Sequence, residues 1–256
     1  MALQPCRTAL LRSRQAARAL LPCARSYTTT TATETPESFK ISPSREPTTS
    51  APRWSRTPEG MKADLQMDFA KNPRNKVWVV NNDPARLDQM YERLLGQGGS
   101  KMLPEELKWL AVTHKSFDQG RRGFNDRLAL VGRMALDVEA VKGIVSKPAD
   151  PKAQQTDEFN RQPFEHPKLT PVDNLNLHDA RESVGKERLA ALARSVGLDS
   201  TVRWKPRVVD NLESSGVEVV LTGAIMAIVG AVTLQHGGAV ATQIIRERIL
   251  ARIPKN

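Results

Sequence analysis

Apolar residues recur at every third or fourth position in several segments of this chain, a spacing that predicts helices. The clearest start is Asp83-Pro84, an N-cap followed by a proline at the first helical position, and Gly96 is placed to end that helix. The expected helices span 84–95, 104–111, 125–145, 175–196, 208–235 and 239–253. With one short extended run at 77–80 as the exception, this pattern predicts an all-α fold.

Two segments lack this periodicity. Residues 28–58 contain 19 Ser, Thr or Pro residues among 31, so we expect residues 28–59 to form a disordered or extended arm. Within this arm Trp54 is interpreted either as part of a solvated linker or as a ring that stacks on a base or on protein. Five prolines interrupt 146–174, which predicts a long loop there.

The segment 219–234 is apolar and carries no charged residue. It has sixteen residues, whereas a helix that spans a membrane needs about 20. Two glycines within it, and Glu213 and Glu218 beside it, favour a helix buried in a protein core. We therefore expect no membrane span.

The first 27 residues contain five arginines and no acidic residue, and their leucines can share one side of a helix. This composition is typical of a mitochondrial transit peptide, with a basic RNA-binding arm as the alternative. Cleavage before Thr28 would leave +5 of the chain's net charge of +10. It would also remove Cys6 and Cys23, the two cysteines, so the mature protein would hold no thiolate nucleophile or thiolate metal site.

The basic balance, with a pI near 9.9, points to a polyanionic partner such as nucleic acid. Long basic side chains in loops and tails reach phosphates most easily. The candidates for RNA contact in such positions are Arg53, Arg56, Lys71, Arg74, Lys76, Arg121, Arg122, Arg203, Lys205 and Arg207. The four histidines are scattered and we expect them to be structural or exposed, so no metal site or cofactor is expected.

Four segments in order are similar to the ribonuclease III endonuclease domain. Residues 111–117 read AVTHKSF beside that family's LTHKSY, and 126–136 read DRLALVGRMAL beside its signature helix, ERLEFLGDAVL. Residues 184–194 read VGKERLAALAR beside VSNETLARLAR, and 220–238 read VLTGAIMAIVGAVTLQHGG beside VLADVFEALIGAIYLDGG. The resemblance implies a ribonuclease III-like helical domain over 60–256, after the transit peptide at 1–27 and the arm at 28–59.

That family cleaves double-stranded RNA with Mg²⁺ held by four carboxylates, and the resemblance places them on two helices. The matching positions here are Ala129, Arg133, Gly223 and Met226. Alanine and glycine offer no ligand, a thioether suits soft metals, and an arginine repels Mg²⁺. The remaining acids, including Glu139, are interpreted as surface charges. We therefore expect a protein that is not an enzyme.

The chain resembles in particular the inactive ribonuclease III-like proteins of the fungal mitochondrial large ribosomal subunit that lack a double-stranded RNA-binding domain. Only three residues follow Ile253, which agrees with that expectation. The implied function is a structural one in the mitochondrial matrix, in contact with mitochondrial rRNA and other large-subunit proteins. The alternatives are an RNA-binding assembly factor or an RNA-processing enzyme of mitochondria.

Ribonuclease III domains pair through their signature helices, and the matching helix here keeps more apolar residues than one core contact needs. The resemblance therefore implies a heterodimer with a second ribonuclease III-like mitoribosomal protein. The expected partner interface consists of Leu128, Leu130, Val131 and Met134.

Overall fold

The structure is a computed structural model that describes residues 54, 78–154, 158–159, 161 and 164–253. The chain divides into two units, 1–48 and 49–256, and every described residue belongs to the second. The predicted transit peptide and all of the predicted arm except Trp54 lie outside the described residues.

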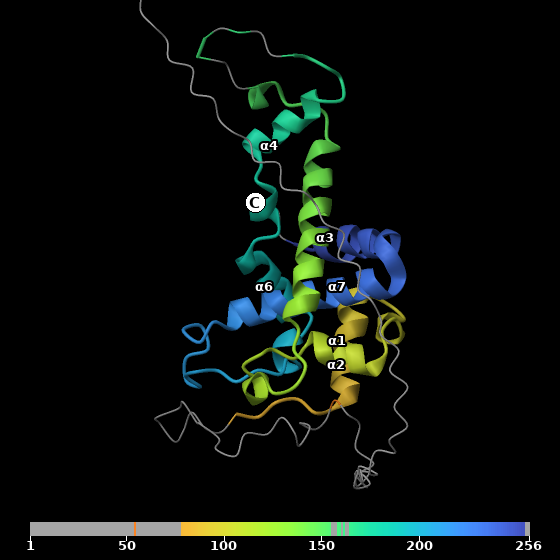
Figure 1. Ribbon diagram of the computed structural model, residues 1–256, viewed down its shortest axis with the longest axis vertical. Coiled ribbons are helices and arrows are strands. Elements are labelled where there is room, and N and C mark those ends of the chain that lie inside the picture. Colours follow the sequence, from red (N-terminus) through yellow and green to blue (C-terminus); the bar gives the residue numbers. More distant parts are fainter. Residues whose placement is uncertain (1–53, 55–77, 155–157, 160, 162–163, 254–256) are drawn as a thin grey trace, which may run out of the picture. The chain divides into compact units, whose positions relative to one another are not determined.

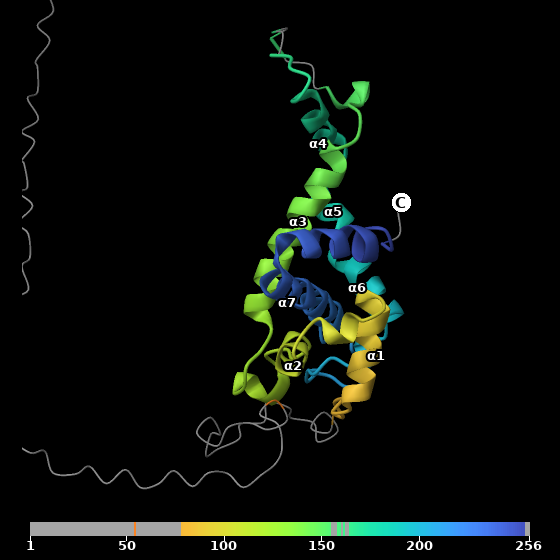
Figure 2. The same ribbon diagram turned by 90° about the vertical axis from the view of Figure 1, so that its right-hand side faces the viewer.

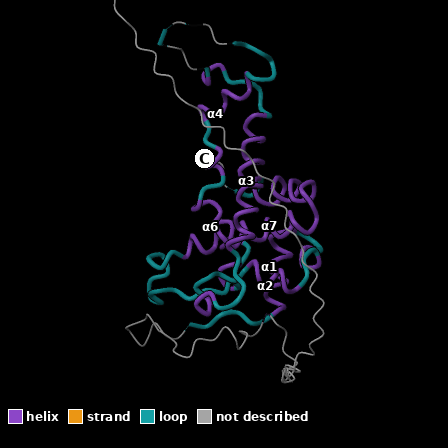
Figure 3. Tube along the Cα trace, viewed as in Figure 1, coloured by secondary structure: helices purple, strands orange, loops and turns teal. Residues whose placement is uncertain are grey.

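The described part of the chain is helical, as predicted, and contains no strand (Figure 3). The only β-type contact within it is an isolated parallel bridge between Thr113 and Arg203. The α-helices are α1 (Pro84–Leu95), α2 (Glu105–Ala111), α3 (Asp126–Val145), α4 (Asn174–Leu177), α5 (Ala180–Ser183), α6 (Lys186–Ser195) and α7 (Val217–Ile244), and a π-helical turn, η9 (Ile245–Leu250), extends α7.

Helix α1 illustrates how local sequence sets an element. The Asp83 carboxylate accepts a hydrogen bond from the Ala85 N–H at 2.9 Å, so it caps the helix. Leu87, Met90 and Leu94 lie on one face at helical spacing and are all buried. Gly96 ends the helix with a φ of 99°, which an L side chain rarely adopts.

The centre of the fold is the crossing of α3 and α7 (Figures 1 and 2). Helix α7 is surrounded by other elements, since α6 and α2 also pack against it, and its residues Ile225 and Ile228 are completely buried. The inward face of α3 consists of Leu128, Gly132, Leu136, Glu139, Ala140 and Ile144. This crossing fixes the relative position of the two helices on which the sequence predicts the replaced metal-ligand positions.

Two of the predicted helices are shorter than expected. The segment 175–196 is divided into α4, α5 and α6, because Asp179 caps a new helix at Arg181 N–H and Gly185 precedes another. The helix expected from 208 begins only at Val217, after a turn that ends at Gly216 with a φ of 81°. Ser215 holds this turn by hydrogen bonds with both backbone groups of Val208.

The predicted loop at 146–174 contains only two short 3-10 turns among its described residues, Pro151–Ala153 and Thr170–Asp173. Asn174 closes its base: the Asn174 side chain accepts from the Asp150 N–H at 2.9 Å and donates to the Pro148 carbonyl at 3.1 Å. Satisfied in this way, a buried amide stabilises a loop that lacks regular structure.

Helix α7 with its extension, Val217–Leu250, is long and apolar enough to cross a membrane by length and composition alone. Its most apolar window is, however, 67% buried inside the protein. Helices α2, α3 and α6 supply the apolar surroundings that a lipid bilayer would otherwise provide, which favours the expected interpretation as a core helix.

Candidate functional site

The four positions that the sequence predicts to match metal ligands lie on α3 and α7. Ala129 and Arg133 are one helical turn apart on α3, and Gly223 and Met226 are three residues apart on α7. The side chain of Arg133 is 60% exposed and pairs with Asp137 at 3.8 Å. No group of three His, Cys, Asp or Glu residues within the described ranges could hold a metal ion.

Glu139 is not the surface charge that the sequence led us to expect. It is only 3% exposed, and its carboxylate accepts hydrogen bonds from Lys142 Nζ at 2.7 Å and Arg246 Nε at 2.8 Å. Thr242 Oγ1 donates a third at 3.1 Å. Burial raises the pKa of Glu139, but these three hydrogen bonds outweigh burial and hold its pKa below the ordinary value. Glu139 thereby fastens η9 and the end of α7 to α3.

A row of exposed apolar residues runs along the outward side of α3. Leu130, Met134 and Val138 are 57%, 62% and 50% exposed, and Val141 continues the row one turn further. We call these four residues the α3 stripe. An adjoining groove of about 350 Å³ lies between α3 and the end of α7, where Val131, Ala135, Ala241 and Ile245 add apolar walls.

This stripe contains two of the residues expected at the partner interface, Leu130 and Met134, and Val131 lines the adjoining groove. Leu128 was assigned wrongly, because it is only 9% exposed and packs in the chain's own core. Val138 and Val141, on the same helix, also face outward. Helix α3 thus has one apolar side in the core and another that nothing in the described chain covers.

Arg203 lies at the centre of a buried aromatic cluster, although the sequence placed it among the RNA contacts. Its guanidinium is 3.9 Å from the ring centroid of Trp109 and 5.0 Å from that of Trp54. These two rings stack on each other with centroids 4.3 Å apart. Arg203 also donates hydrogen bonds to Asn82 Oδ1 at 3.0 Å and to the carbonyls of Asn81 and Trp54. We call Trp54, Trp109 and Arg203 the Arg203 cluster.

Arg203 is 1% exposed, so it cannot reach a phosphate and its prediction as an RNA contact is wrong. Burial, with a smaller effect from the neighbouring charge of Arg122, lowers the pKa of Arg203 to about 10, so that it stays protonated at neutral pH. The sequence did not reveal this role, because the side-chain partners of Arg203 lie far away in the chain. The backbone at 203 is extended and forms hydrogen bonds with Val112 and His114. Only the fold brings the two tryptophans to it.

The other candidate RNA contacts differ in their exposure and in their pairing with acidic residues. Arg121 and Arg122 both pair with Asp118, at 2.5 and 3.4 Å, and each side chain is 16% exposed. Lys205 is half-buried and Arg207 is exposed. The remaining five, at 53, 56, 71, 74 and 76, lie outside the described residues.

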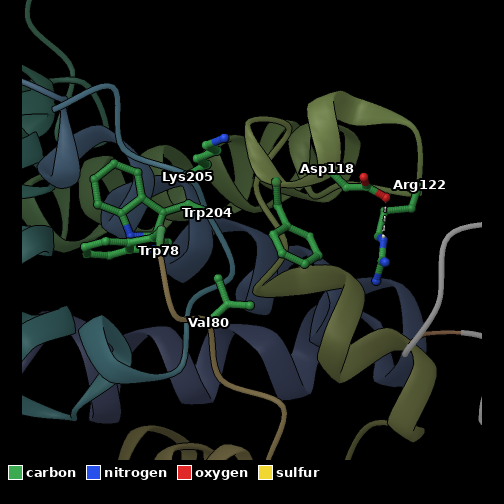
Figure 4. A pocket seen from close by; sticks show the side chains of 7 residues that line it. Trp78, Val80, Asp118, Arg122, Trp204 and Lys205 are labelled. Carbon is green, nitrogen blue, oxygen red and sulfur yellow. Dashed lines mark hydrogen bonds and ion pairs between the residues drawn. The ribbon is translucent and has the colours of Figure 1, made fainter. Parts of the chain in front are cut away.

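A second aromatic pair lies on the other side of the same extended segment. Trp204 is 3% exposed and meets Trp78 edge to face, with ring centroids 5.9 Å apart. Beside them is a pocket of about 280 Å³, which we call the Trp78 pocket. Its lining residues are Trp78, Val80, Phe117, Asp118, Arg122, Trp204 and Lys205, and Figure 4 shows Trp78 and Trp204 on one side of it and Arg122 on the other.

Residues 113–116, which read THKS, hold this pocket together. Ser116 Oγ accepts the Lys205 N–H at 3.0 Å, and the His114 N–H donates to the Arg203 carbonyl at 2.8 Å. Burial lowers the pKa of His114, so its ring is neutral at neutral pH, and the Ser116 N–H donates to Nδ1. The sequence alone does not reveal the pocket, because its walls come from three segments far apart in the chain.

The family model described as ribonuclease-III-like matches residues 104–253. The large ribosomal subunit protein mL57 of Neurospora crassa is 44% identical over 237 residues, which are 92% of this chain and 87% of that protein.

Among solved structures, the nuclease domain of ribonuclease III from Campylobacter jejuni is similar at 21% identity, with a TM-score of 0.43 over 69% of this chain and 99% of that one. A second structure of the same domain has 22% identity and the same TM-score, over 65% of this chain and 99% of that one.

Proposed function

This chain belongs to the ribonuclease-III-like family, and from that premise we propose that it is a structural constituent of the mitochondrial large ribosomal subunit. The observation that carries the proposal is 44% identity over 92% of the chain to a protein named for the large ribosomal subunit. The acid-free, arginine-rich first 27 residues support import into the mitochondrial matrix. In that subunit the chain contacts rRNA and other proteins.

The proposed role is not enzymatic. Of the residues at the four metal-ligand positions, Ala129 and Gly223 have no oxygen in the side chain, and Met226 offers only sulfur. Arg133 adds a positive charge, partly offset by Asp137, at a position where Mg²⁺ requires a carboxylate. A nuclease of this family without its metal ligands has no means to activate water or to stabilise the leaving oxygen.

The α3 stripe is the proposed contact with a second ribonuclease III-like protein. An exposed row of apolar residues beside an apolar groove marks a protein interaction surface. Two copies of this chain would bring two Arg133 side chains toward one groove, and like charges at short range repel. A related chain that carries acidic residues opposite Arg133 avoids this repulsion, which favours a heterodimer.

The proposed rRNA contacts are the predicted basic side chains other than Arg203, which is excluded because it is buried. Arg207 is exposed and Lys205 is half-buried, and both follow the buried Arg203-Trp204 pair. Arg121 and Arg122 contribute from the neighbouring loop, with part of their charge offset by Asp118. The basic residues of the arm, Arg53, Arg56, Lys71, Arg74 and Lys76, extend the contact.

Sedimentation of mitochondrial lysate tests this proposal. The protein should migrate with the large subunit in a sucrose gradient and stay there at high salt, because an integral component is held by more than phosphate contacts. An assembly factor would leave at high salt or migrate with precursor particles. A protein found only in fractions free of ribosomal subunits would refute the structural role.

A further inference from the structure

The Trp78 pocket has walls suited to a flat aromatic ligand. Trp78, Trp204 and Phe117 contribute rings and Val80 contributes an apolar side chain, while Trp78 itself remains half-buried. A volume of about 280 Å³ lies just below the usual range for small-molecule sites and suits a ligand as small as a single base. Stacking of an unpaired base on a tryptophan ring is a common way in which proteins hold RNA.

The rim of the pocket carries the charge that a nucleotide needs. Arg122 and Lys205 are both lining residues, and Arg207 is exposed two residues beyond Lys205. The single carboxylate in the lining, Asp118, already accepts hydrogen bonds from Arg121 at 2.5 Å and from Arg122 at 3.4 Å, so its charge is largely offset. Among the lining residues two are basic and one is acidic, so a phosphate at the rim meets more positive than negative side chains of the lining.

The loop that forms this rim has an uncommon backbone. Asp118 and Gln119 have φ values of 50° and 54°, in the left-handed region that residues other than glycine rarely occupy. Such a conformation carries a cost in free energy and is retained where the surrounding structure requires it, often at a binding site. Here it brings the Asp118 carboxylate to both arginines and leaves the ring of Phe117 in the pocket wall.

We propose that the Trp78 pocket binds one unpaired nucleotide of RNA, with its base against Trp78 and its phosphate near Arg122 and Lys205. The proposal rests on the proposed function, since the RNA in question is the rRNA of the large subunit. A duplex cannot present a base to a pocket of this size without opening a base pair. The site therefore selects a bulged or looped nucleotide.

Fluorescence anisotropy with the full chain tests the proposal, using three RNA probes at one fixed salt concentration. The probes are a single-stranded oligonucleotide, its fully paired duplex, and the same single strand with abasic sites. The unaltered protein should bind the intact single strand about tenfold more tightly than the abasic strand, because one stacked base contributes about 1–3 kcal/mol. Equal affinities for these two strands would overturn the proposal without any substitution.

Substitutions at the pocket test whether the preference for the intact single strand arises from Trp78. Trp78→Ala should weaken binding of the single strand about tenfold and leave duplex binding unchanged, whereas Trp78→Phe should retain most of the affinity. Val79→Ala is the matched control, because Val79 is 87% exposed and does not line the pocket. The abasic strand should bind the Trp78→Ala variant no more weakly than it binds the unaltered protein.

The outcomes separate this inference from the proposed function. If Trp78→Ala lowers the melting temperature but leaves RNA affinity unchanged, the pocket is filled by the chain itself and the inference is wrong. If the variant weakens single strand and duplex equally, the pocket contributes only general phosphate binding and the inference is also wrong. In either case, co-sedimentation with the large subunit would still stand as independent support for the structural role.

Discussion

Gly132 and Gly230 face each other where α3 crosses α7, and neither has room for a side chain. A Cβ atom on Gly132 would lie 2.7 Å from the Gly230 nitrogen, and one on Gly230 would lie 3.0 Å from the Gly132 nitrogen. Because the obstacle is backbone and not a flexible side chain, neither helix can yield without moving the other. The two glycines therefore set the distance between the helices at the centre of the fold.

Substitution of either glycine tests this close approach. Gly132→Ala or Gly230→Ala should lower the free energy of unfolding by about 2–3 kcal/mol, since overpacking forces the helices apart. Gly143→Ala on the same α3 is the control, because a Cβ there meets no atom within 4 Å. It should be neutral or stabilising by about 0.5–1 kcal/mol. Urea denaturation measures all three, and equal effects at 132 and 143 would contradict the close packing.

The proposed loss of the metal ligands predicts an absence of nuclease activity. Purified protein should leave double-stranded RNA intact in the presence of Mg²⁺ or Mn²⁺, because Ala129, Arg133, Gly223 and Met226 provide no hard oxygen ligand. Gel electrophoresis of the RNA is a sufficient measurement. Cleavage that depends on metal and persists in preparations freed of contaminating nucleases would contradict the proposed structural role.

The α3 stripe predicts a defect in assembly without a defect in folding. Leu130→Asp together with Met134→Asp should leave the melting temperature nearly unchanged, because both side chains are more than half exposed. The doubly substituted protein should be depleted from large subunits, since a buried charge opposes an apolar interface. Val219→Asp provides the control. Val219 is 59% exposed and lies near the start of α7, whereas the groove beside the α3 stripe lies near the end of α7. Normal incorporation of the stripe variant would place the partner contact elsewhere.

Arg203 and Arg207 should respond in opposite ways to removal. Arg203→Ala removes the guanidinium from the face of Trp109 and leaves Asn82 Oδ1 and the Asn81 carbonyl without this donor, so stability should fall by about 3 kcal/mol or more. Arg207→Ala changes an exposed residue and should leave stability unchanged. It should instead weaken RNA binding and reduce the salt dependence by about one phosphate contact. Reversed effects would restore Arg203 as an RNA contact.

The Glu139 network predicts a loss of stability in acid. The folded protein holds the pKa of Glu139 below its usual value, so ionised Glu139 stabilises the fold at neutral pH. That contribution is present above the unfolded pKa, near 4.5, and is lost as pH falls through the lower folded pKa. Glu139→Gln should cost about 1–2 kcal/mol at pH 7 and remove this part of the acid dependence. An unchanged difference between variant and parent from pH 7 to pH 3 would contradict it.

Much of the fold followed from the sequence alone. Helical spacing gave α1, α2 and α3 with nearly correct limits, because each has an apolar stripe and a capping or terminating residue of its own. Four motifs in the family's order predicted the ribonuclease III-like family, and the family model that matches residues 104–253 confirms it. The sequence also carries the prediction that the metal ligands are lost, since a residue without a suitable ligand atom cannot bind Mg²⁺ in any conformation.

Other features were decided only by tertiary structure. Helical periodicity does not say which of two apolar faces of α3 is buried, and the neighbouring α7 turned Leu128 inward and left Val138 exposed. A charged residue looks the same in sequence whether it is solvated or buried. Arg203 and Glu139 were misjudged for that reason, because their partners, Trp54 and Arg246, lie more than a hundred residues away in the chain. Burial and pairing between residues so far apart depend on how the whole chain packs. The local sequence pattern therefore does not predict them.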